Sequence, residues 1–275
     1  MPHPCLPLEL ERVIFIEALD DSPRDFTPLF LVAKRVRTWL VPFAFKVVVL
    51  IPEEEFFPCK FHRVSHFKEY GQYIHHLLIT PCHAWPSISD NLDECLSYCP
   101  NIINLTIWDM SPSLKIKSLL NIPTLTRLWV DIDYLYDQIR ISTQTGNQLI
   151  TVFPKLTHLE IGGYLPDDFD IKANVLALAR LFPSLTHIGF MAEILPNPDL
   201  FNSVLHHLKH LKALVWYDPS PWRRLFALRE MPMGVDDDRV VLSNEAGREW
   251  EDIARGKVLG MWELVDEVLE EKGAT

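Results

Sequence analysis

The chain has 275 residues, of which 48% are hydrophobic, so it is long and apolar enough to bury a sizeable core in one or two domains. Its net charge of −11 argues against nucleic acid as a partner, because phosphate binding requires a basic face. The most apolar run, residues 41–51, contains Lys46 and is shorter than the roughly 18 residues of a membrane span, so we expect no membrane insertion.

The five cysteines are an odd number without a paired framework, and Glu9 and Glu11 fall where a signal segment would be apolar. We therefore expect a reducing compartment, the cytoplasm or the nucleus.

The N-terminal region reads as helical. Residues 6–19 open with a proline at a helix start and repeat apolar residues on one face, which predicts an amphipathic helix. A second helix is predicted over residues 29–40, ended by Pro42, and the β-branched run at 47–50 predicts the first strand.

One nine-residue pattern recurs along the middle of the chain: an aromatic or apolar residue, Pro, x, Leu or Ile, x, x, Leu or Ile, x and a last apolar residue. The clear copies are 99–107, 122–130, 153–161 and 182–190. Degenerate copies carry Ile74, Leu77 and Ile79 early in the chain and Leu211, Leu214 and Trp216 late in it. The prolines, at 100, 123, 154 and 183, are spaced by 23, 31 and 29 residues, which is typical of solenoids and repeat arrays.

Helical segments are predicted between these strands. They cover residues 90–98, 114–120, 148–153, 171–182 and 199–211, and those that precede a clear copy end before its proline, which disfavours helical geometry in its predecessor. From residue 231 the chain holds 12 acidic and 5 basic residues, so 7 of the 11 net negative charges lie there. Residues 245–272 predict a helix, broken at Gly256 and Gly260, that forms an acidic C-terminal cap. Its apolar stripe is Val258, Met261, Trp262, Val265 and Leu269.

The N-terminal pattern resembles an F-box, the helical module by which substrate receptors dock on a Skp-type adaptor and through it on a cullin. The resemblance covers about residues 5–45. It implies the following adaptor-binding residues: Leu6, Pro7, Leu10, Val13, Ile14, Leu31, Val32, Lys34 and Trp39. The alternative is that these helices only cap the open end of the repeat array, as every solenoid requires.

The repeated strand resembles that of leucine-rich repeats, with two departures. The Asn that follows the last apolar position in that family is replaced by Met110, Asp133, Tyr164 and Glu193, and the repeat spacing is irregular. The whole chain is similar to the F-box-like, leucine-rich-repeat-like proteins numerous in mushroom-forming fungi. The expected fold is α/β, with an F-box-like module (1–45), an irregular leucine-rich-repeat-like solenoid (46–230) and an acidic helical cap (231–275).

The candidate metal-binding and catalytic motifs in the sequence are incomplete. Cys59, His62 and His66, with Cys82 and His83 downstream, have metal-like spacing but lack a Cys-x-x-Cys pair. A second group, His206, His207 and His210, is read as an exposed helix face. The sequence contains neither a Gly-x-Ser-x-Gly element nor a phosphate-binding glycine loop, so we expect no enzyme activity, no metal and no cofactor.

The polar positions of the repeated strands alternate with the apolar ones, so neighbouring copies should form columns on one sheet face. Trp and Arg dominate binding hot spots, which makes Trp108, Arg127 and Trp129 the leading target-binding candidates. The same columns add Asp131, His158, Glu160 and His187. The alternative is that helices or loops cover this face.

These features predict a non-enzymatic substrate-recognition adaptor of an SCF-type ubiquitin ligase, with a protein target of unknown identity. The alternative is a repeat-based interaction scaffold unconnected to ubiquitin transfer. Docking predicts that apolar residues among Leu6, Leu10, Ile14 and Leu31 are exposed, whereas a cap would bury them.

Overall fold

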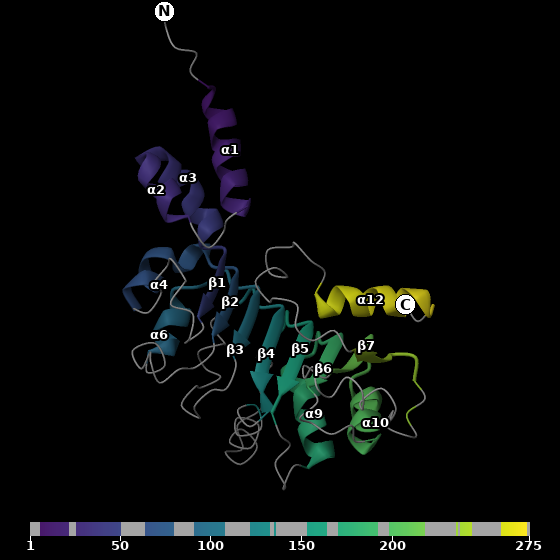
Figure 1. Cartoon of the computed structure of the whole chain (residues 1–275). Helices are drawn as coiled ribbons and strands as arrows, with labels where there is room; N and C mark the ends of the chain where they lie inside the picture. Colours follow the sequence, from purple (N-terminus) through teal and green to yellow (C-terminus); the bar gives the residue numbers. More distant parts are fainter. Residues whose placement is uncertain are drawn as a thin grey trace, which may run out of the picture.

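The computed structural model describes most, but not all, of the chain. The described residues are 6–21, 26–50, 64–79, 91–107, 122–132, 135, 153–163, 170–191, 198–217, 235, 237–243 and 260–273. Within them the fold is α/β, as predicted: helices pack on an open, all-parallel sheet (Figure 1).

The eight described strands lie side by side in the same order as in the chain. They are β1 (Val47–Leu50), β2 (His76–Ile79), β3 (Asn104–Ile107), β4 (Arg127–Asp131), β5 (His158–Gly162), β6 (His187–Met191), β7 (Ala213–Tyr217) and β8 (Val240–Ser243). The predicted copies also pair in register, because Leu105 lies beside Leu128, Leu128 beside Leu159 and Leu159 beside Ile188. Both degenerate copies form strands too, β2 and β7.

The proline of the repeated pattern sits in a β-turn that leads into the strand. The Leu156 N–H donates to the Phe153 carbonyl at 3.3 Å, with Pro154 at the second turn position, where its fixed φ is favourable. Equivalent bonds run from Leu125 to Ile122 and from Leu185 to Phe182. The pattern is therefore a turn followed by a strand.

A ladder of threonines joins neighbouring copies just before the strands. The Thr186 hydroxyl lies 3.2 Å from the Thr157 carbonyl, and the Thr157 hydroxyl lies 3.2 Å from the Thr126 carbonyl. The Thr126 hydroxyl donates in turn to the Ile103 carbonyl. The same carbonyls already accept backbone N–H bonds from the next copy, so these hydroxyl contacts add to a register that the backbone fixes.

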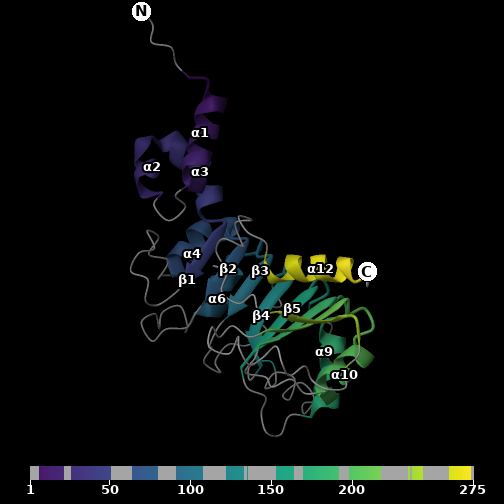
Figure 2. The ribbon, with the colours of Figure 1, turned by 45° about the vertical axis from the view of Figure 1, so that its right-hand side comes forward.

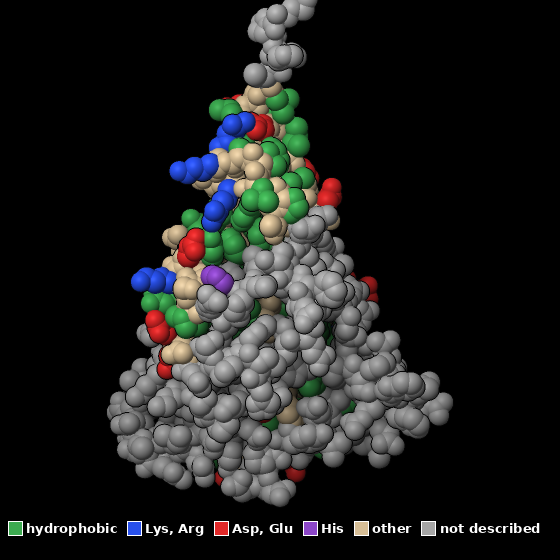
Figure 3. Space-filling model, turned by 60° about the vertical axis from the view of Figure 1, so that its left-hand side comes forward, with side chains coloured by type: hydrophobic (Ala, Val, Ile, Leu, Met, Phe, Trp, Pro, Cys, Tyr) green, Lys and Arg blue, Asp and Glu red, His purple; other side chains and the backbone are tan. Residues whose placement is uncertain are grey.

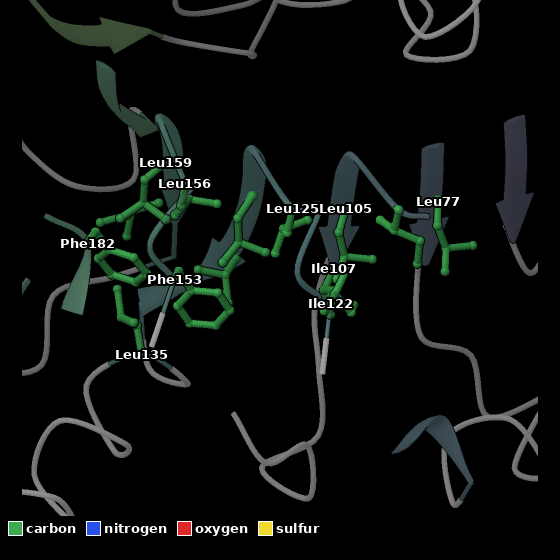
Figure 4. Packing of buried hydrophobic residues seen from close by; sticks show 14 of the residues in the cluster. Leu77, Leu105, Ile107, Ile122, Leu125, Leu135, Phe153, Leu156, Leu159 and Phe182 are labelled. Carbon is green, nitrogen blue, oxygen red and sulfur yellow. The ribbon is translucent and has the colours of Figure 1, made fainter. Parts of the chain in front are cut away.

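The main core lies on one face of the sheet, where the apolar positions of successive copies meet. Leu77, Leu105 and Leu159 are fully buried, and Phe153 stacks on Phe182 with ring centroids 5.4 Å apart (Figure 4). Because every copy supplies the same positions, the core runs without interruption from strand to strand.

Helices α6 (Leu92–Ser97), α9 (Ile171–Leu181) and α10 (Pro198–His207) fall in predicted helical segments. The last ends four residues before the predicted end at residue 211, because the turn that precedes β7 occupies those residues. The predicted helix at 114–120, and residues 148–152 of the next one, lie outside the described residues.

The N-terminal helices are α1 (Leu8–Asp21), α2 (Thr27–Val32) and α3 (Lys34–Ala44). The prediction of a single helix over 29–40 is wrong, because Ala33 has extended backbone geometry and separates two helices. The prediction that Pro42 ends the helix is also wrong. Pro42 lies on the exposed side of the last turn, where it removes one hydrogen bond while Leu40 and Ala44 remain packed in the core.

Three elements were not anticipated: α4 (Val64–Tyr70), the 3₁₀-helix η1 (Gly71–Tyr73) and β8. Because β8 pairs with β7, the C-terminal segment contributes a strand to the sheet as well as a helix. Its short run of Val240, Val241 and Leu242 is the signal that marks this strand.

Helix α12 (Met261–Glu271) begins directly after Gly260, one of the two glycines at which a break was predicted. It lies on the sheet face opposite α9 and α10 (Figures 1 and 2). Its Trp262, Val265 and Leu269 form a second, smaller core with sheet residues such as Val215 and Val241. Among the described helices, none combines the length and apolar character needed to cross a lipid bilayer.

Candidate functional site

Two surfaces carry the predicted binding residues: the N-terminal helices and the sheet face beneath α12. On the helices, a set of large apolar side chains is exposed to solvent. This set, the N-terminal apolar set, comprises Leu6, Leu8, Leu10, Val13, Ile14, Leu31 and Val32. Figure 3 shows hydrophobic side chains beside Lys and Arg side chains on one side of these helices.

Solvent exposure is large for the side chains that a docking module would expose and a cap would bury. Leu10 is 52% exposed, Ile14 54% and Leu31 80%. Leu6, Leu10 and Ile14 are spaced by four residues, so they follow one face of α1 and its N-terminal flank. Leu8, which the sequence analysis did not single out, is also exposed.

The helices are held by a different set of residues. Leu19, Val36 and Leu40 are buried at 2% exposure or less, and Trp39 is partly buried against the same core. Their packing does not use the N-terminal apolar set. Of the adaptor-binding candidates that remain, Pro7 and Lys34 are exposed.

At the inner end of the helical unit, aromatic and polar contacts join α3 to the body. Phe45, which follows α3, stacks on Tyr70 of α4 with ring centroids 4.1 Å apart, and Arg37 donates to the Tyr70 hydroxyl at 3.1 Å. Arg35 of α3 forms an ion pair with Glu11 of α1 at 2.8 Å. These contacts orient the helices against the β1 end of the sheet.

The polar columns predicted on the opposite sheet face are present in the predicted register. Arg127 lies beside His158, and His158 beside His187, while Trp129 lies beside Glu160. Gly162 makes room for the Trp129 indole, because a Cβ at residue 162 would lie 2.5 Å from its Cζ2 atom. Trp108, the remaining leading candidate, lies outside the described residues.

The face is not open at these columns, because α12 packs on it. Trp129 is 7% exposed and His187 5% exposed, so neither side chain faces a free surface, and their role in target binding stays a prediction. Asp131, His158 and Glu160 are half-buried. The alternative stated for this face, that a helix covers it, describes this part of the sheet.

Two stacked histidines and a tryptophan form the centre of the contact. The His158 and His187 rings lie 4.3 Å apart and nearly parallel, and the Trp262 ring meets both edge-on at 5.2 and 5.5 Å. Each histidine Nδ1 lies 2.8 Å from the hydroxyl of the preceding threonine, Thr157 or Thr186.

Burial disfavours the charged form of both histidines. Burial, followed by the charges of His187 and Arg127, lowers the pKa of His158 to about 3. Burial also lowers the pKa of His187, although the hydrogen bond and charge of Asp266 act in the opposite direction. Both rings are therefore neutral at neutral pH.

Charged groups of α12 meet the sheet at two points. Arg127 Nη2 lies 2.6 Å from Glu263 Oε1, and His187 Nε2 lies 3.0 Å from Asp266 Oδ1. Burial acts to raise the pKa of Glu263, but the hydrogen bond and charge of Arg127 outweigh it, so this pKa lies below its usual value. Trp262 was predicted in the apolar stripe of the cap, whereas Glu263 and Asp266 carried no predicted role.

The candidate metal motif is only partly described. Cys59, His62, Cys82 and His83 lie outside the described residues, and His66 lies on α4. Within the described part, no group of three His, Cys, Asp or Glu side chains is arranged to hold a metal ion. His206 and His207, at the end of α10, contact each other edge-on.

The two described cysteines are unsuited to nucleophilic chemistry. Cys95 and Cys99 are buried free thiols, and burial raises the pKa of each to about 12.

Comparisons of the chain with protein-family models and with curated proteins find no match.

Proposed function

We propose that this chain is a non-enzymatic substrate-recognition adaptor: its N-terminal helices dock a Skp-type adaptor of an SCF-type ubiquitin ligase, and its sheet body holds a target protein. The observation that carries the proposal is the exposure of the N-terminal apolar set on helices whose own core is built from other residues.

Leaving the N-terminal apolar set in contact with water costs free energy. Solvent-exposed Leu, Ile and Val side chains at helical spacing gain free energy when a partner covers them, at about 25 cal/mol for each Å² of apolar surface removed from water. Helices that served only as a cap would turn these residues onto the body, as they do Leu19 and Val36. A docking function accounts for apolar residues that do not pack on the body.

The body supports the second half of the proposal. Parallel strands in chain order, with equivalent residues in register, are what a leucine-rich-repeat-like body would have. Its role would be positioning: a bound target is held near a conjugating enzyme supplied by the other subunits, so its effective concentration rises. No residue of this chain is required to do chemistry in this scheme.

The test is co-purification of the full chain with a Skp-type adaptor and a cullin. We expect the parent chain to bind and the double variant Leu10→Asp, Ile14→Asp to lose binding at least tenfold, because two charges would enter the apolar interface. Val268→Asp is the matched control, since Val268 is an exposed apolar residue on α12, away from the N-terminal helices. Circular dichroism establishes that each variant is folded.

The opposite outcome is also informative. A well-folded parent that fails to bind any Skp-type adaptor would remove the ubiquitin-ligase role. The chain would then be best described by the alternative, a repeat-based interaction scaffold whose N-terminal helices serve only as a cap.

A further inference from the structure

Helix α12 occupies the very face on which the polar columns of the repeats converge, and its contacts form an ordered pattern. Trp262, Val265, Asp266 and Leu269 stand at i, i+3, i+4 and i+7, the spacing by which a helix presents one face to a groove. Glu263 adds a second charged contact beside the tryptophan.

The sheet provides a fitted position for the tryptophan. A Cβ at residue 189 would lie 3.2 Å from Trp262 Cη2, so the glycine leaves room for the indole to approach the strand. The paired rings of His158 and His187 border the indole on the neighbouring strands. Trp262 itself is 4% exposed. A buried aromatic anchor of this kind is typical of binding hot spots.

Charge and apolar contacts then fix the direction of the helix. Arg127 on β4 binds Glu263, and His187 on β6 binds Asp266. On the same face of α12, Val265 and Leu269 pack in the apolar cluster that includes Val215 and Val241. The cation Arg127 on β4 and the apolar residues on β7 and β8 thus accept an acidic amphipathic helix in one orientation.

The apolar contacts of α12 are buried, whereas its polar contacts lie where solvent reaches them. Side-chain exposure is 32% at Arg127, 35% at Glu263 and 50% at Asp266, so water reaches the polar anchors. A helix of eleven residues is also marginal on its own and depends on the surface that it covers.

We propose that the sheet face beneath α12 is a recognition groove for acidic amphipathic helices of the pattern Trp-Glu-x-Val-Asp-x-x-Leu, which α12 occupies in the free protein and which a partner helix of the same chemistry takes over. The inference deepens the target-binding half of the proposed function. Its test contains no Skp-type adaptor, so failure of one can be told from failure of the other.

The probe is a fluorescein-labelled peptide with the sequence of residues 258–273, titrated with the full chain and followed by fluorescence anisotropy. In the parent chain the tethered α12 competes at high effective concentration, so we expect weak binding. The Trp262→Ala chain leaves the sheet unchanged but loosens its own helix. We expect it to bind the peptide at least tenfold more tightly than the parent, and not to bind a peptide in which the same tryptophan is alanine.

A charge exchange tests the specificity of the groove. The full chain carrying Arg127→Glu repels its own Glu263, and we expect it to bind the peptide carrying Glu263→Arg at least tenfold more tightly than the unchanged peptide. The Trp262→Ala chain should show the reverse preference. A sheet face that bound peptides only through apolar contacts would bind the unchanged and the Glu263→Arg peptides with equal affinity.

Three results would overturn the proposal. The first is a folded Trp262→Ala chain that binds no peptide, and the second is a folded pair of variants that do not distinguish the two peptide charges. The third is a parent chain that light scattering shows to be a dimer exchanging α12, since the occupant would then be a second copy rather than a partner. If Arg127→Glu fails to fold, the two peptides measured on the Trp262→Ala chain still decide the question.

Discussion

At the residue scale, Gly162 and Gly189 occupy positions of the sheet face where an indole ring leaves too little room for a Cβ. Gly162→Ala would place its Cβ 2.5 Å from Trp129 Cζ2, and the Trp129 ring is buried, so it has little freedom to move away. We expect the free energy of unfolding to fall by about 1–3 kcal/mol. Chemical denaturation measures it, with the exposed Lys155→Ala at a repeat turn as control. An unchanged denaturation midpoint would show that the ring is free to shift.

The stacked histidines predict a pH dependence. Both folded-state pKa values lie below the unfolded value of about 6.5, so below that pH the unfolded chain binds more protons than the folded chain, down to about 3 in the case of His158. Their contribution to stability is therefore complete above pH 6.5 and is lost as the pH falls, at up to about 1 kcal/mol per pH unit for His158. Chemical denaturation at pH 7.5 and 5.5 should show a smaller loss for His158→Phe, which keeps a flat ring; equal losses would contradict the assignment.

At the scale of the element, a side-chain cap defines the start of α9. The Asp170 side chain accepts a hydrogen bond from the Ala173 N–H at 2.9 Å, which satisfies a free donor of the first turn. We expect Asp170→Ala to lower the free energy of unfolding by about 1 kcal/mol and Asp170→Ser to restore most of it. Thermal denaturation measures both, with the exposed Lys172→Ala as control. A Ser variant no better than Ala would argue against the cap.

At the scale of the whole molecule, the N-terminal helices contain one set of residues for folding and another for the proposed docking. Leu19→Ala should cost about 2–5 kcal/mol because Leu19 is 2% exposed in the core. Leu10→Asp and Ile14→Asp should each change the free energy of unfolding by about 0.5 kcal/mol or less. Chemical denaturation of the three variants separates the sets. A large loss in the two Asp variants would mean that these residues support the fold.

Much of the fold could be predicted from the repeated pattern, because turn chemistry and strand periodicity are local. Proline at the second turn position and apolar residues at alternate strand positions predict β3 to β6 from sequence, and the apolar positions alone predict β2 and β7. In-register copies predict the columns of Arg127, His158 and His187. The two wrong predictions, a single helix over 29–40 and its end at Pro42, also concern local structure. The break at Ala33 leaves no proline or glycine signal, and Pro42 is tolerated because the packing around it outweighs one lost hydrogen bond.

The α/β class, the repeated turn-and-strand unit and the amphipathic stripe of the last helix follow from residues that are near one another in the chain. Which surfaces are open to solvent follows only from how distant segments pack. Exposure depends on the contacts that each side chain makes with distant residues, so Leu10 and Leu31 are exposed while Trp129 and His187 are buried. The contact between Arg127 and Glu263 joins residues 136 positions apart, and local periodicity carries no information over that distance.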